Sequence, residues 1–157
     1  MDTSFTADEH FRRGQTALEC DQYEVALEHF RAAQRVDPNS PRFRSYYGLC
    51  LGIAKRRFDQ ALELCRSAAK EEFFNPELYR NLAQVHLAFG FKAEGIRYLR
   101  RGLMIDPANQ EILNDLRILG VRRRPALGFL PRRHLLNRWL GIFRGRPRAD
   151  TQERCSA

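Results

Sequence analysis

The feature that most constrains the fold of this chain is an internal repeat with a period of 34 to 35 residues. Small residues recur at two positions of the repeat, at Gly14, Gly48 and Ala83 in one and at Ala26, Ala61 and Gly95 in the other. Asp37-Pro38 also returns, two periods later, as Asp106-Pro107. Such a period is typical of solenoids, in which each repeat buries its apolar face against its neighbours. With 157 residues and 43% apolar content, the chain supports one such domain.

Within a repeat, the pattern predicts two helices joined by a short turn. Thr6 followed by Glu9 indicates a capping box that opens a helix over residues 7–20, and a second helix is expected over about 23–36. In that second helix, apolar and small residues return at intervals of three and four, which indicates one buried face. Asp37-Pro38 ends the helix, because proline has no N–H to donate.

The later repeats begin with similar signals. Ser40 and Asn75 are expected to cap helices whose first residues are Pro41 and Pro76, where a missing N–H costs nothing. The second helix of the middle repeat starts one residue later than a strict 34-residue period requires, and Phe73-Phe74 takes the place of a turn proline. We therefore expect the turn after the second repeat to be longer than the other turns.

A last amphipathic helix, over residues 110–120, is predicted to cover the apolar face of the third repeat, since a solenoid needs a terminal cap. The expected organisation is a lead-in over 1–6, a repeat domain over 7–121 with repeats at about 7–40, 41–75 and 76–109, and a tail over 122–157.

The period and the recurring small residues, aromatic residues and prolines resemble the tetratricopeptide repeat family over roughly residues 7–109. The resemblance implies an all-α fold, a right-handed superhelical α-solenoid of three helix-turn-helix repeats plus a capping helix. The small residues would lie where paired helices cross closely. The aromatic residues expected to fill the gaps in the core are Tyr23, Phe30, Phe58 and Tyr79.

The resemblance also implies a non-catalytic scaffold or adaptor that binds a peptide or helix of a partner protein along the concave face, which the first helices line. Matching the chain to the motif places nine residues on that face: Phe11, Gln15, Leu18, Ser45, Leu49, Gly52, Arg80, Gln84 and Leu87. Phe11 and Gln15 stand where some family members place the Lys and Asn that clamp chaperone tails, so such tails are not the expected ligand. Two alternatives stay open: a chaperone that shields a hydrophobic segment of a secretion substrate, and a groove covered by the chain's own tail.

The net charge of +8 comes from the tail. Residues 1–121 contain 17 Lys and Arg against 17 Asp and Glu, whereas residues 122–157 contain 10 against 2. A short basic amphipathic helix is predicted over about 132–144, with a disordered end after it. The tail residues expected to make contacts are Arg132, Arg133, Leu136, Trp139, Leu140 and Phe143.

Three roles are open for this tail: packing on the solenoid, lying on an anionic membrane surface, or docking into a partner. Nucleic-acid binding through its arginines is a further alternative, which moderate salt should abolish.

Other features argue against catalysis. The four cysteines form no C-x-x-C pair, so reduced, buried thiols are expected at Cys20, Cys50, Cys65 and Cys155. The histidines show no catalytic spacing, and His86 is predicted to be a hydrogen-bonded core residue. We expect no enzyme activity, no cofactor or metal and no small-molecule substrate. The absence of a signal-peptide pattern and of a long apolar run predicts a cytoplasmic protein, whose oligomeric state stays open.

Overall fold

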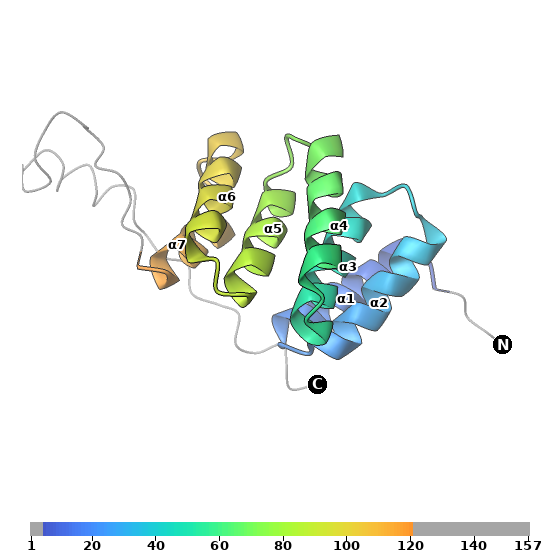
Figure 1. Ribbon diagram of the computed structural model, residues 1–157. Helices are drawn as coiled ribbons and strands as arrows, with labels where there is room; N and C mark the ends of the chain where they lie inside the picture. The colour runs from blue at the N-terminus through green and yellow to red at the C-terminus, as the bar shows by residue number, and fades with distance from the viewer. Residues whose placement is uncertain (1–4, 121–157) are drawn as a thin grey trace, which may run out of the picture. The chain divides into compact units, whose positions relative to one another are not determined.

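The computed structural model describes residues 5–120, so the expectations for the lead-in before Phe5 and for the tail lie outside the described residues. The described part forms seven helices: α1 (Ala7–Glu19), α2 (Tyr23–Val36), α3 (Pro41–Lys55), α4 (Phe58–Glu71), α5 (Pro76–Ala88), α6 (Lys92–Ile105) and α7 (Gln110–Ile118). They follow one another side by side in chain order, from α1 and α2 at one end to α6 and α7 at the other (Figure 1). The all-α helical-repeat solenoid is confirmed.

The helix starts are capped as the sequence predicts. The backbone N–H of Glu9 donates to the Thr6 hydroxyl at 3.3 Å, and the Thr6 N–H donates to the Glu9 carboxylate at 2.9 Å, which completes a capping box. Ser40 accepts from the N–H of Phe43 at 3.4 Å, and Asn75 accepts from the N–H of Glu77 at 3.1 Å. Each of the three odd helices of the repeats therefore begins at a side-chain cap.

The expectation of a longer turn after the second repeat is wrong. The connections between repeats, residues 37–40, 72–75 and 106–109, each contain four residues. The extra residue of the middle repeat belongs instead to its first helix, because α3 has 15 residues where α1 and α5 have 13. Arg56 then closes a shorter turn in the left-handed conformation, with φ of 56°. Its guanidinium donates to the carbonyl of Ala88 at 2.9 Å, which ties this turn to the end of α5.

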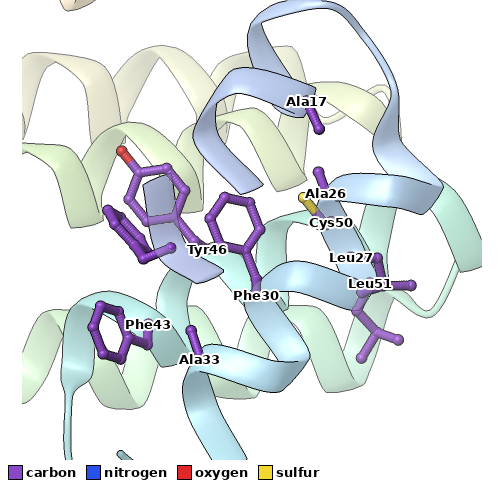
Figure 2. Packing of buried hydrophobic residues seen from close by; sticks show 10 residues of the cluster. Ala17, Ala26, Leu27, Phe30, Ala33, Phe43, Tyr46, Cys50 and Leu51 are labelled. Carbon is purple, nitrogen blue, oxygen red and sulfur yellow. The ribbon is translucent and has the colours of Figure 1, made fainter. Parts of the chain in front are cut away.

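Small residues at the crossings of paired helices set how closely the helices pack. A Cβ on Gly14 would lie 2.6 Å from the Phe30 ring, and a Cβ on Gly48 would lie 2.9 Å from Cβ of Leu64 and 3.2 Å from the carbonyl oxygen of Ala61. The distances of 2.6 and 2.9 Å are shorter than carbon atoms tolerate and the 3.2 Å distance is tight, so a larger residue at either position would force the neighbouring side chains to shift. Figure 2 shows Phe30 and Tyr46 in the resulting core, with ring centroids 5.2 Å apart.

Two of the four expected core aromatics are buried. Phe30 and Tyr79 are in the core, whereas Tyr23 and Phe58 are half-buried. Phe58 packs against Phe89 and Phe91 at the edge of the repeat, with ring centroids 4.7 and 5.1 Å apart.

The cysteines follow the prediction only in part. Cys50 and Cys65 are buried free thiols, and burial raises the pKa of each to about 12. Cys20 is half-buried and is not a free thiol, so the prediction is wrong for it, and Cys155 lies outside the described residues.

Helix α7 packs against α6, and its buried residues are Ile112 and Leu116. Ile112 is fully buried and occupies the space left by Gly102, where a Cβ would lie 2.6 Å from Cδ1 of Ile112. Between residues 5 and 120, none of the helices is both long and apolar enough to span a bilayer.

Candidate functional site

The odd-numbered helices line an open hollow of about 390 Å³, here called the groove. Five of the nine residues expected on the concave face contribute to it: Gln15, Leu18, Arg80, Gln84 and Leu87. All five are half-buried, so each presents part of its side chain to solvent. The groove therefore contains both apolar and amide side chains from α1 and α5.

The other four expected residues are buried, so the prediction that packing leaves them free is wrong. Ser45 and Leu49 are 0% exposed, Phe11 is 3% exposed, and Gly52 lies against Ala61 and Val85. Three of these four belong to α3, which has neighbouring helices on both sides. Nine of the 15 residues of α3 are buried, against three of 13 in α1. Phe11 is buried because its ring inserts between Phe43 and Tyr46 of α3, at centroid distances of 5.1 and 5.0 Å.

Two of the residues that line the groove, Asn81 and Tyr46, are buried and have hydrogen-bond partners within the chain. The Asn81 side chain, 2% exposed, donates to the Ser45 hydroxyl at 3.2 Å, and the Cys65 thiol donates to the Ser45 carbonyl at 3.3 Å. The Tyr46 hydroxyl donates to Glu77 at 3.4 Å. Burial raises the pKa of Tyr46 to about 12, and the Glu77 charge adds to this effect. The phenol is therefore neutral at physiological pH.

Arg80 holds helix α7 at one end of the groove. Its guanidinium donates to Asp115 and to Glu111, each at 2.8 Å. Burial works against the charged form, but the hydrogen bond and charge of Asp115, followed by the charge of Glu111, more than offset it, so the pKa of Arg80 is raised. An equivalent contact joins α3 to α5, where Arg42 pairs with Glu77 at 3.1 Å. The Nε and Nη1 donors of Arg80 are thus both paired with carboxylates of α7.

The opposite end of the groove is acidic. Glu19 ends α1, and Asp21 follows in the turn with φ of 58°. The turn is closed by hydrogen bonds from the N–H of Asp21 to the Leu18 carbonyl at 3.1 Å and from the N–H of Gln22 to the Ala17 carbonyl at 2.9 Å. The Tyr23 hydroxyl donates to Oδ1 of Asp21 at 2.9 Å. Both carboxylates are exposed, and neither takes part in an ion pair within residues 5–120.

Sequence reasoning missed seven residues that line the groove: Glu19, Asp21, Tyr23, Tyr46, Ile53, Asn81 and Glu111. Two of them, Asp21 and Tyr23, belong to the turn and to α2, so a rule restricted to the first helices overlooks them. The sequence did contain a signal for this turn. Asp-Gln lies between two helical patterns, and Asp tolerates the left-handed conformation that such a turn requires.

His86 is buried as expected, but the hydrogen bond predicted for it is wrong. It is 4% exposed, and neither ring nitrogen has a hydrogen-bond partner in the described part of the chain. Its ring stacks on Tyr98 at 5.3 Å and meets the edges of Phe58 and Phe91. Burial lowers the pKa of His86, and the charge of Arg66 lowers it further, so the imidazole is neutral at pH 7.

No group of three or more His, Cys, Asp or Glu residues that could hold a metal ion occurs within residues 5–120.

Solved structures that share this architecture include the two described here. The first repeat domain of Spaghetti (RPAP3), bound to the HSP90 peptide SRMEEVD, aligns with a TM-score of 0.56 and 19% identity over 73% of this chain and 90% of that chain. The OM64 domain of Arabidopsis aligns with a TM-score of 0.57 and 16% identity over 73% and 94%. Both are tetratricopeptide repeat domains. The chain has the tetratricopeptide repeat fold. In this fold the odd helices of our chain are the first helices of each repeat, and α7 follows the third repeat.

One curated relative is similar at the level of sequence. The auxiliary subunit NAA15 of the N-terminal acetyltransferase A complex of Arabidopsis thaliana is 30% identical over 120 residues. The match covers 76% of this chain and only 13% of the relative, so the chain corresponds to a small part of that protein. No family model matches the chain.

Proposed function

We propose that this chain is a non-catalytic scaffold that binds an extended or helical segment of a partner protein in the groove. The observation that carries the proposal is the open, mixed lining contributed by four successive odd helices. A surface built from several helices suits a long segment better than a compact ligand.

The groove lining can supply both affinity and orientation. Leu18, Ile53 and Leu87 are half-buried, so a partner side chain placed on them would remove further apolar area from water. Burial of this kind contributes about 25 cal/mol per Å². Gln15 and Gln84 carry amide groups that can both donate to and accept from a peptide backbone. This division of roles is common in peptide sites, where apolar contacts provide affinity and polar groups fix register.

The Spaghetti domain, which is bound to an HSP90 peptide, supports the view that this architecture presents a peptide site. That peptide, SRMEEVD, is acidic. In our chain the one arginine that lines the groove already pairs with Glu111 and Asp115, and Phe11 is buried. The groove therefore offers no equivalent free cation within the described residues, which supports the prediction that chaperone tails of this type are not its ligands.

Selection of peptides from a displayed random-sequence library, with the full chain immobilised, tests the proposal. Gln84→Trp would fill the groove with a large side chain, whereas Gln60→Trp, at an exposed position on α4, provides the matched control. We expect selected peptides to lose binding to Gln84→Trp and to keep it with Gln60→Trp. Equal binding to both variants, or no selected peptide at all, would contradict a role for the groove.

The predicted roles of the tail stay predictions, because its residues lie outside the described part of the chain. Binding to nucleic acid or to anionic vesicles through the tail should collapse between low and moderate salt, whereas apolar contacts in the groove should change little. Shielding of a hydrophobic secretion segment would use the same groove and would appear in the library as a preference for uncharged, apolar peptides.

A further inference from the structure

The charge of the groove lining is unbalanced. Three carboxylates, Glu19, Asp21 and Glu111, line it together with a single guanidinium, that of Arg80. Arg80 pairs with both Glu111 and Asp115, so at that end one guanidinium faces two carboxylates and one negative charge is left over. The larger excess is at the other end, where Glu19 and Asp21 have no ion-pair partner within residues 5–120 and line the groove together with the apolar side chain of Leu18.

The acidic end is held in a defined geometry before any partner binds. The hydrogen-bonded turn fixes the backbone of Asp21, and the Tyr23 hydroxyl holds Oδ1 of its carboxylate at 2.9 Å. A carboxylate has two oxygens and about four acceptor positions, so this single hydrogen bond leaves capacity for a further donor. A fixed acceptor loses less conformational entropy on binding than a mobile side chain does.

The ring of Tyr23 adds a second feature that favours a cation. Elsewhere the chain places its own arginines over aromatic rings: Arg13 lies 3.7 Å from the Phe5 centroid, and Arg56 lies 4.2 Å from the Phe89 centroid. Five such contacts occur in the described residues, and none of them involves Tyr23. Tyr23 is half-buried, lines the groove and contacts the Asp21 carboxylate, with Glu19 in the same lining, and an aromatic ring beside carboxylates is a combination that an arginine binds well.

We propose that the groove selects a basic segment of a partner protein, with an arginine or lysine seated against Asp21, Glu19 and the Tyr23 ring and apolar residues against Leu18, Ile53 and Leu87. The inference rests on the proposed peptide-binding function and specifies the chemistry of the peptide. Charge complementarity supports this occupant, because an acidic segment would place like charges together at this end of the groove.

The same random-sequence library tests this inference with a different pair of variants. Glu19→Gln with Asp21→Asn removes both charges and keeps the side-chain shape, and Asn tolerates the left-handed conformation required in the turn. The matched control is Glu24→Gln with Glu28→Gln, which makes the same change in net charge at two exposed positions of α2 that do not line the groove.

We expect peptides selected on the natural chain to carry an excess of Arg and Lys over Asp and Glu. The excess should disappear in the Glu19→Gln, Asp21→Asn variant and persist in the control. For one selected peptide, replacement of its arginine by the neutral analogue citrulline should weaken binding to the natural chain about tenfold, as expected for loss of a charged hydrogen bond. The same replacement should leave binding to the double variant unchanged.

Two outcomes would overturn the inference: selected peptides without a basic excess, or an excess that survives in the double variant. Either result leaves the proposed groove function intact if Gln84→Trp still abolishes binding. If instead Gln84→Trp has no effect, the groove itself is not the site, and both proposals fail together.

Discussion

The close helix crossings inside a repeat and the polar contacts between odd helices are held by different physical means. Inside a repeat, Gly48 lies against α4 at a distance that excludes even a methyl group. Between odd helices, apolar packing such as that of Phe11 against Tyr46 is accompanied by polar contacts, such as Arg42 with Glu77 and Arg80 with Asp115. The close crossings depend on the shape of the packed side chains, whereas the polar contacts depend on their charge and length.

Because of this difference, substitutions in the groove should lower the stability of the fold less than substitutions at the helix crossings. Steric contacts in a close-packed interior tolerate almost no added volume. Polar contacts at a half-exposed edge each contribute less, and water can replace part of what is lost. The four predictions below test this division, from the largest expected effect on stability to the smallest.

Added volume inside a repeat should have the largest effect. We expect Gly48→Leu, Ala61→Leu and Ala26→Leu each to lower the free energy of unfolding by roughly 1 to 3 kcal/mol, through overpacking at helix crossings. Thermal and urea unfolding would measure the change. Ala93→Leu, at an exposed position on α6, is the control and should have little effect. Unchanged stability in the three variants would contradict the steric role given to these crossings.

Loss of the Arg80 contacts should have an intermediate effect. Arg80→Ala leaves Asp115 without its partner, and we expect a loss of about 1 to 2 kcal/mol together with faster amide exchange in α7. Arg100→Ala, at an exposed position on α6, is the control. A change of Arg80 to probe binding would therefore also disturb the fold, which makes Gln84 the better probe of the groove. If α7 exchanges at the natural rate in Arg80→Ala, the ion pairs do not hold it.

His86 should make stability depend on pH. Its pKa is lowered below 6.5 by burial and by Arg66, so the unfolded chain binds more protons as the pH falls through 6.5, and stability is lost on acidification. His86→Phe removes two unpartnered nitrogens from an aromatic site, so we expect a gain of up to about 1 kcal/mol at pH 7. The gain should increase between pH 6.5 and 5. Parallel stability curves for the two proteins over this range would show that His86 does not titrate in this way.

Truncation of a groove side chain should have the smallest effect on stability. Gln84→Ala is expected to change the free energy of unfolding by no more than about 0.5 kcal/mol, because the side chain is half-buried and takes no part in the ion pairs around Arg80. Circular dichroism melts against the natural chain would measure it. A loss as large as that of Ala61→Leu would place Gln84 among the residues that hold the fold, and the distinction between the two kinds of contact would no longer apply.

Sequence alone was sufficient for the repeat period, the helix pairs, the caps at Thr6, Ser40 and Asn75, and the small residues at the crossings. These features are local or periodic, so propensities, capping chemistry and spacing determine them. The concentration of positive charge after residue 121 is likewise a property of composition.

Only the tertiary structure decided which side chains remain available for binding. Leu49 and Leu87 belong to the same helical pattern, yet Leu49 is fully buried in a cluster with residues of α4 and α5, whereas Leu87 is half-buried and lines the groove. Asp21 and Tyr23 reach the groove only because a left-handed turn directs them there. Exposure depends on the number and placement of neighbouring helices, and a repeat pattern that is the same in every unit contains no information about those neighbours.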